Sequence, residues 1–264
     1  MGLFKKKPKR EPIPGLFGEA TDYGIYTPSP KEKILWFLIA MIASGAVLFL
    51  FYESILVSVI AGTVCGIIFI PIRTKQMIYK RRQKLTLQFR ELLDALATSI
   101  GAGENIWDAF KGAVEDLEIQ FTHESDIVRE VEMICVGMNH AINVEDLLMN
   151  FAQRSGVEDI ENFASVFVTC YRKGGKISDV IQNTAEIIGD KIEIKMELET
   201  MVAGQKNEMN IMLVMPLLFV IVMKSMGGSL VDLTTPVGIL SVTGALAIFI
   251  LAYLAGRWIT NIKL

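Results

Sequence analysis

The chain has 264 residues, a net charge of −3 and a hydrophobic fraction of 52%. So high an apolar fraction, gathered into long runs, excludes an ordinary soluble protein and indicates a membrane protein with one modest soluble domain. About 13 Lys/Arg precede Leu85, whereas residues 85–206 hold about 22 Asp/Glu against about 10 Lys/Arg. An acidic soluble domain argues against nucleic acid as a partner, because phosphate binding needs a basic surface.

The three cysteines, Cys65, Cys135 and Cys170, lack the paired spacing of a disulfide framework or a zinc site. All three lie at apolar positions, so we expect buried free thiols. Such thiols indicate that the soluble domain faces a reducing compartment.

Residues 1–33 form a basic leader with several prolines and glycines, so we expect it to be irregular and cytoplasmic. The run Lys5-Lys6-Lys7-Pro8-Lys9-Arg10 is suited to anionic lipid, at about 1 kcal/mol for each charge near the surface. A second interpretation, in which this run acts only as a topology signal, stays open.

The first two membrane spans are predicted within residues 34–72, as a hairpin that turns at Glu53. The runs Ile34 to Tyr52 and Ser54 to Ile72 are each about 19 residues long, enough to cross about 30 Å of hydrocarbon. Residues 73–84 then make a basic juxtamembrane linker. Because positive charges flank the hairpin and none lies in its turn, both the N-terminus and the chain after the hairpin are predicted to be cytoplasmic.

Residues 85–206 are predicted to form a cytoplasmic domain that is helical throughout, because apolar residues recur at three and four positions without the alternation of a strand. Asn105 and Asn143 are residues that commonly cap helix N-termini. Gly174-Gly175 ends one helix, and the next continues without proline into an apolar segment that starts near Met209. Expected members of the buried stripes include Leu85, Phe89, Leu92, Leu93, Leu96, Phe110, Leu117, Ile127, Val131, Cys135, Leu147, Phe151, Ile160, Phe163, Phe167, Tyr171, Ile181, Ile187 and Ile188.

The third span is predicted at residues 207–227, an external loop at 228–236, and the fourth span with a short cytoplasmic tail at 237–264. Pro216 lies inside the third span and Lys224 near its outer end, where we expect the amine to reach the interface. The predicted fold class is therefore all-α. It is a polytopic membrane protein with four transmembrane helices and a cytoplasmic helical-bundle domain inserted between the second and third.

No catalytic constellation is predicted, so we expect no enzyme activity. Gly174-Gly175-Lys176 is similar to the end of a phosphate-binding loop, but the earlier glycine and the following Ser/Thr are missing and helices flank it. His123 and His140 fall on different expected elements, and we expect no metal or cofactor; the alternative of a metal ion at a carboxylate cluster stays open. The many carboxylates are interpreted as solvated helix faces.

The order and spacing of several motifs resemble the F domain of type II secretion systems. These motifs are Gly101-Ala102-Gly103 before Ile106-Trp107-Asp108-Ala109-Phe110, then Phe151-Ala152-Gln153-Arg154-Ser155-Gly156, then Arg172-Lys173-Gly174-Gly175-Lys176-Ile177, with Pro216 in the following span. The single copy and the leading hairpin resemble the shorter platform proteins of tight-adherence (Tad) pili. Lys176, which stands where a small polar residue is usual, and the loop at 227–236 depart from the pattern and leave the subfamily open.

This resemblance implies an inner-membrane platform protein of a type IV-pilus-like or secretion machine, which is not itself an enzyme. The resemblance also implies that the cytoplasmic domain meets a hexameric secretion ATPase and that the spans meet pilin or pseudopilin subunits. A homo-oligomer, or a hetero-oligomer with a sister platform protein, is expected in the lipid bilayer.

We expect partners to contact the glycine turn and its surroundings, and the acidic helix faces are a further candidate docking surface. The candidate partner-binding residues are Arg172, Lys173, Gly174, Gly175, Lys176, Asp179, Glu158 and Asp159. Gly204 and Pro216 are candidate hinges for passing motion from the helical domain to the third span. The alternative, that Pro216 only kinks a span for packing, stays open.

Two other classes of function stay open. A membrane permease subunit driven by a nucleotide-binding chain would need polar residues at the midplane of the spans, which the sequence lacks. A membrane-tethered signalling domain would need a recognisable sensor or output site.

Overall fold

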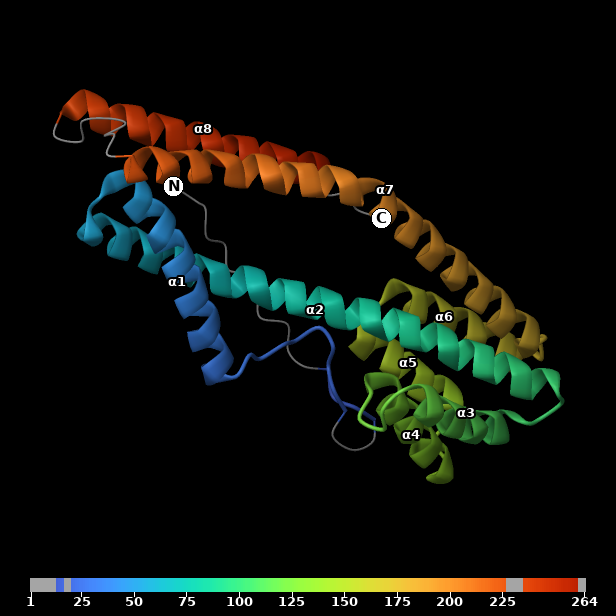
Figure 1. Ribbon diagram of the computed structural model, residues 1–264. Helices are drawn as coiled ribbons and strands as arrows, with labels where there is room; N and C mark the ends of the chain where they lie inside the picture. Colours follow the sequence, from blue (N-terminus) through green and yellow to red (C-terminus); the bar gives the residue numbers. More distant parts are fainter. Residues whose placement is uncertain (1–12, 17–19, 227–234, 261–264) are drawn as a thin grey trace. The chain divides into compact units, whose positions relative to one another are not determined.

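A computed structural model describes residues 13–16, 20–226 and 235–260, and within these ranges every regular element is a helix (Figure 1). The all-α class predicted from the sequence is therefore confirmed. The helices are α1 Pro30–Tyr52, α2 Ile55–Gly101, α3 Ile106–Gln120, α4 Asp126–Asn139, α5 Val144–Ser155, α6 Glu158–Lys173, α7 Ile177–Ser225 and α8 Pro236–Thr260. Most of the predicted external loop and the polybasic run of the leader lie outside the described residues.

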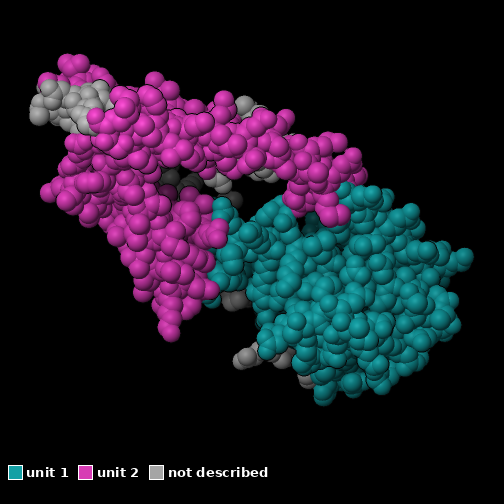
Figure 2. All heavy atoms as spheres, viewed as in Figure 1, with its two compact units in different colours: residues 1–27, 74–193 teal, residues 28–73, 194–264 magenta. Residues whose placement is uncertain are grey.

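The chain divides into two compact units, coloured separately in Figure 2. Unit 1 comprises residues 1–27 and 74–193, and unit 2 comprises residues 28–73 and 194–264. Unit 1 is thus shifted toward the N-terminus relative to the predicted domain at 85–206.

Unit 2 contains the helices α1 and α8 and the apolar parts of α2 and α7. Four helices of the described chain are long and apolar enough to cross a membrane, namely α1, α2, α7 and α8. Glu53 takes the left-handed conformation that ends α1 and turns the chain into α2, as the hairpin prediction requires. Glycines then allow the two helices to approach closely, since a Cβ at Gly62 would lie 3.0 Å from the Met41 carbonyl oxygen and one at Gly66 would meet the Phe37 ring.

Lys224, near the end of α7, makes two contacts with the end of α1. Its Nζ donates to the carbonyl oxygen of Leu50 and lies 2.7 Å from Oε1 of Glu53, which ties the end of α7 to the hairpin turn. At the same end of unit 2, the hydroxyls of Tyr52 and Thr243 are hydrogen-bonded at 2.8 Å. The ionisable side chain of the third span is therefore paired with a carboxylate at a helix end.

Two helices run from one unit into the other without a break. Helix α2 has 47 residues and includes Pro71, and α7 has 49 residues and includes Pro216. The predicted juxtamembrane linker at 73–84 is part of α2, because its Lys, Arg and Gln residues favour helix and it contains no glycine or proline to stop one. Each proline removes one backbone hydrogen bond, a loss that membrane helices tolerate when neighbouring groups compensate.

The core of unit 1 is built from the predicted apolar stripes of α2 to α6 and the first turns of α7. At its centre the ring of Phe89 lies 5.4 Å from Phe163 in an edge-on arrangement and 6.3 Å from Phe151. Each such side chain, fully buried, stabilises the fold by about 1.5–3 kcal/mol. Tyr171 and Ile187, which the periodicity placed on these stripes, are exposed at their edges.

The turns between the helices follow from local chemistry. The side chain of Asn105 accepts the backbone N–H of Asp108 and so caps α3, whereas that of Asn143 makes no such bond at α5. Ser125 caps α4 through the N–H of Val128. Gly174 ends α6 at a φ of +68°, a conformation that glycine adopts without steric cost.

Candidate partner-binding site

The predicted glycine turn forms an exposed corner between α6 and α7. The N–H of Gly175 donates to the carbonyl oxygen of Cys170 at 2.8 Å, which closes the end of α6. Residues 171–176 are all exposed, and α7 begins directly after them with Ile177 packed against the core. The corner is therefore held by backbone hydrogen bonds while its side chains face solvent.

Three basic side chains, Arg172, Lys173 and Lys176, lie on this corner of an otherwise acidic unit. Arg172 Nε is 3.7 Å from Oε1 of Glu145, a carboxylate that is only 12% exposed. Among the described residues, no ion pair involves Lys173 or Lys176. We call residues 171–176 the basic corner, a surface able to meet an acidic partner surface.

The other predicted contact residues do not all join the basic corner. Lys191 donates to both carboxylate oxygens of Asp159, at 2.8 and 3.1 Å, which ties the start of α6 to α7. Asp159 is thus engaged within unit 1, while Glu158 is exposed in the first turn of α6. Asp179 is exposed in the first turn of α7, where its carboxylate complements the helix dipole.

The two candidate hinges lie within the unbroken helix α7. A Cβ placed at Gly204 would meet nothing within 4 Å. Pro216 falls in the apolar part of the same helix. Neither residue ends the helix, so any flexibility at these positions is bending within one rod.

A buried ion pair inside unit 1 was not predicted from the sequence. Arg154 on α5 donates from Nη1 to Oε1 of Glu130 on α4 at 2.7 Å, and from Nη2 to Oε2 at 2.5 Å. The side chains are 4% and 1% exposed. Arg154 Nε also donates to the Asn150 side chain at 2.7 Å. Two parallel bonds of this kind are the strongest arrangement for an arginine and a carboxylate.

The leader covers this ion pair. The hydroxyl of Tyr23 donates to Oε1 of Glu130 at 2.9 Å, and Arg154 Nη1 donates to the carbonyl oxygen of Thr21 at 3.0 Å. The guanidinium of Arg81 lies 4.8 Å from the centre of the Tyr23 ring and makes two hydrogen bonds to Asp126. Burial raises the pKa of the Tyr23 hydroxyl well above its ordinary value, and the Glu130 carboxylate adds to this rise. Tyr23 is therefore a neutral donor that seals the pair.

The comparison with known families decides the identity of the chain. The model of the family described as "Type II secretion system (T2SS), protein F" matches residues 92–223, which is half of the sequence. The chain belongs to this family. It is an inner-membrane platform protein of the type II secretion and type IV-pilus-like class. No curated protein and no solved structure matches the chain.

The matched region of this T2SS F-family protein includes the basic corner, both candidate hinges and both members of the buried ion pair. The leader with Tyr23 lies outside it. The sequence contained a signal for the pair, since Glu130 follows Ile127 by three positions on the buried face of α4, and Arg154 follows Phe151 likewise on α5. A charged residue at an apolar stripe position indicates a buried partner.

We expect Glu130→Gln to destabilise this F-family protein by about 3–5 kcal/mol, because Arg154 is left buried without a countercharge. The free energy of unfolding of the full chain in detergent, measured with denaturant, checks this. The control is Glu124→Gln, at a carboxylate that is 81% exposed and 4.0 Å from Arg129. Its expected cost is within about 1 kcal/mol, and equal losses in the two variants would contradict the role of the pair.

Proposed function

We propose that this protein is a Tad-type platform that couples a hexameric cytoplasmic ATPase to the assembly or export of pilin subunits. Family membership supports the class of machine. The coupling itself is supported by one structural observation, the unbroken run of α7 from the core of the helical unit into an apolar span.

Helix α7 is suited to passing motion along the chain. Its first turns are anchored in unit 1, where Ile181, Ala185 and Ile188 are buried in the core. Its residues 194–225 lie in unit 2, where Lys224 is paired with Glu53. Since a helix is stiff along its axis, a tilt or shift imposed on the first part reaches the second unless the helix bends between them. Helix α2 offers a second connection of the same kind.

The proposed orientation places the helical unit and both termini in the cytoplasm. It is supported by the Lys/Arg residues that flank the first two spans and by their absence from the turn at Glu53. In this orientation the basic corner faces the compartment that contains ATP and the ATPase. Its three cations favour docking of an acidic surface of the partner. Such charges raise the association rate of the two proteins and fix the position in which they dock.

The alternative of a permease subunit is favoured less by the structure. A transport path needs ionisable or polar groups within the membrane interior. Lys224 instead lies at the end of its helix, paired with the carboxylate of the hairpin turn. Association with a second copy or a sister platform protein belongs to the proposed assembly.

The basic corner is tested by the triple variant Arg172→Gln, Lys173→Gln and Lys176→Gln. We expect the affinity of the solubilised protein for its ATPase to fall by about tenfold or more, with a weaker dependence on salt, because steering charges are lost. Purified ATPase binding to the immobilised full chain provides the measurement. Lys111→Gln with Arg129→Gln removes exposed charges elsewhere on unit 1 and is the control. Unchanged binding in the triple variant would rule out this docking surface.

The continuity of α7 is tested at Met201, which is 64% exposed. Met201→Pro breaks the helix at a cost of about 3 kcal/mol or more, and we expect pilus assembly to be lost while the protein remains in the membrane. Met201→Ala removes the same exposed side chain but keeps the helix, so assembly should stay near the wild-type level. The measurement is the amount of pilin in the sheared surface fraction of cells. Wild-type assembly with Met201→Pro would contradict coupling through α7.

A further inference from the structure

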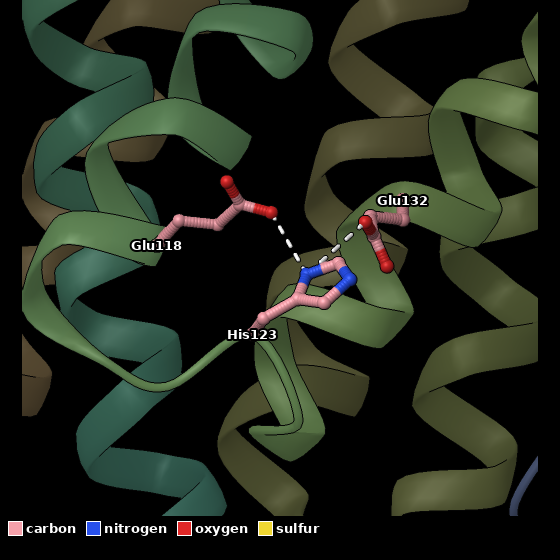
Figure 3. Close-up of side chains that lie close together, drawn as sticks. All are labelled: Glu118, His123 and Glu132. Atoms are coloured by element: carbon pink, nitrogen blue, oxygen red, sulfur yellow. Dashed lines mark ion pairs between the residues drawn. The ribbon is translucent and has the colours of Figure 1, made fainter.

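Three metal-ligating side chains converge at one edge of unit 1, between α3 and α4 (Figure 3). Glu118 lies in the last turn of α3, His123 in the connection that follows, and Glu132 in the second turn of α4. Nδ1 of His123 is 2.9 Å from Oε1 of Glu118 and 3.6 Å from Oε1 of Glu132. The three ligand atoms all lie within 4.8 Å of one another.

The fold brings these three residues together although they lie on two different helices and the connection between them. Helices α3 and α4 pack against each other and are joined by residues 121–125 alone. Phe121 packs against the core at one end of this connection, and Ser125 caps α4 at the other. The imidazole of His123 is thereby held between the two glutamate side chains, as Figure 3 shows.

An ion pair with His123 alone does not satisfy both glutamate carboxylates. A ring nitrogen carries at most one hydrogen, so Nδ1 can donate fully to one carboxylate at a time while two face it. A divalent cation placed among the three atoms would contact all of them. Ligand atoms about 2.0–2.2 Å from a tetrahedral ion lie about 3.3 Å apart, close to the two distances observed.

We propose that Glu118, His123 and Glu132 bind a divalent transition-metal ion such as Zn²⁺. One nitrogen and two oxygen donors suit Zn²⁺, Mn²⁺ or Co²⁺ better than Ca²⁺ or Mg²⁺, which prefer oxygen ligands only. Two carboxylates and a neutral imidazole balance the charge of the ion. On binding, Nδ1 carries no proton and gives its lone pair to the metal, while Nε2 keeps the ring hydrogen.

The consequence of this site would be a cross-link between α3 and α4. Water would complete the coordination, because Glu118 and His123 are exposed and Glu132 is half-buried. Because the ligands meet only in the folded unit, metal binding would stabilise unit 1 by mass action. This inference is independent of the proposed coupling role, since it concerns binding and stability alone.

The test uses the full chain, purified in detergent with an affinity tag that lacks histidine and stripped of metal with a chelator. Titration with Zn²⁺ by calorimetry should give one ion per chain, and the midpoint of thermal unfolding should rise with Zn²⁺. His123→Ala should weaken binding by about tenfold or more and remove the rise in the unfolding midpoint. Glu132→Gln should weaken binding in the same direction.

Two control variants show whether the other histidine or a nearby thiol binds the ion instead. His140→Ala removes the second of the two histidines, and Cys135→Ser removes the thiol one turn from Glu132 on α4; both should bind like the wild type. Equal Zn²⁺ affinity in the wild type and His123→Ala would overturn the proposal. So would wild-type protein that binds no Zn²⁺, which would leave His123 as the partner of an ion pair only.

Discussion

A backbone within hydrocarbon finds no water for its N–H and C=O groups, so each crossing must satisfy them within its own helix. The helices that this constraint requires do not all stop where the apolar residues end. Two of the four apolar helices continue further along the chain. Helices α2 and α7 continue into the helical unit and supply part of its core. Unit 1 of this F-family protein is therefore built partly from extensions of two apolar helices, with α3 to α6 added between them.

Helices α2 and α7 both contribute to unit 1, but they do so through different contacts. Helix α2 contributes Phe89 to the centre of the core, between rings from α5 and α6. Helix α7 is anchored through Ile181 and Ile188 and by the ion pair of Lys191 with Asp159. Helices α2 and α7 each cross the boundary between the units as one helix, so the chain bends there as a helix does, whereas the third crossing, at residues 27–28, precedes α1 and lies outside any helix.

The ion pair of Glu130 and Arg154 is a buried pair of charges beside the mainly apolar core of unit 1. Burying two charges costs several kcal/mol, which is offset only when the pair is close and fully hydrogen-bonded. The leader meets this requirement by adding the Tyr23 hydroxyl and the Thr21 carbonyl oxygen. Of the leader, residues 13–16 and 20–29 are irregular and residues 30–33 belong to α1; the irregular part includes Thr21 and Tyr23, which complete the hydrogen bonding of the pair.

Elements with a local signal could be predicted from the sequence, whereas contacts between distant residues could not. The spacing of apolar residues predicted the helices and most of the core, and Gly174 marked the end of α6 because its conformation is set by its own backbone. Glu53 marked the hairpin but not its pairing with Lys224. The convergence of His123 with two glutamates, and of Tyr23 with the buried pair, depends on how helices pack, which no short stretch of sequence encodes.

The continuity of α7 between the two units is the central claim, and a distance between spin labels tests it most directly. Labels at Ile187→Cys and Met212→Cys, both exposed positions on α7, are attached in a chain whose three native cysteines are replaced. An unbroken helix places the two backbone positions about 37 Å apart, at about 1.5 Å per residue. Double electron–electron resonance spectroscopy of the labelled protein in lipid nanodiscs should give a narrow distribution of label-to-label distances near that value. A broad distribution, or a centre shorter by about 10 Å or more, would show that the helix breaks and would contradict the account.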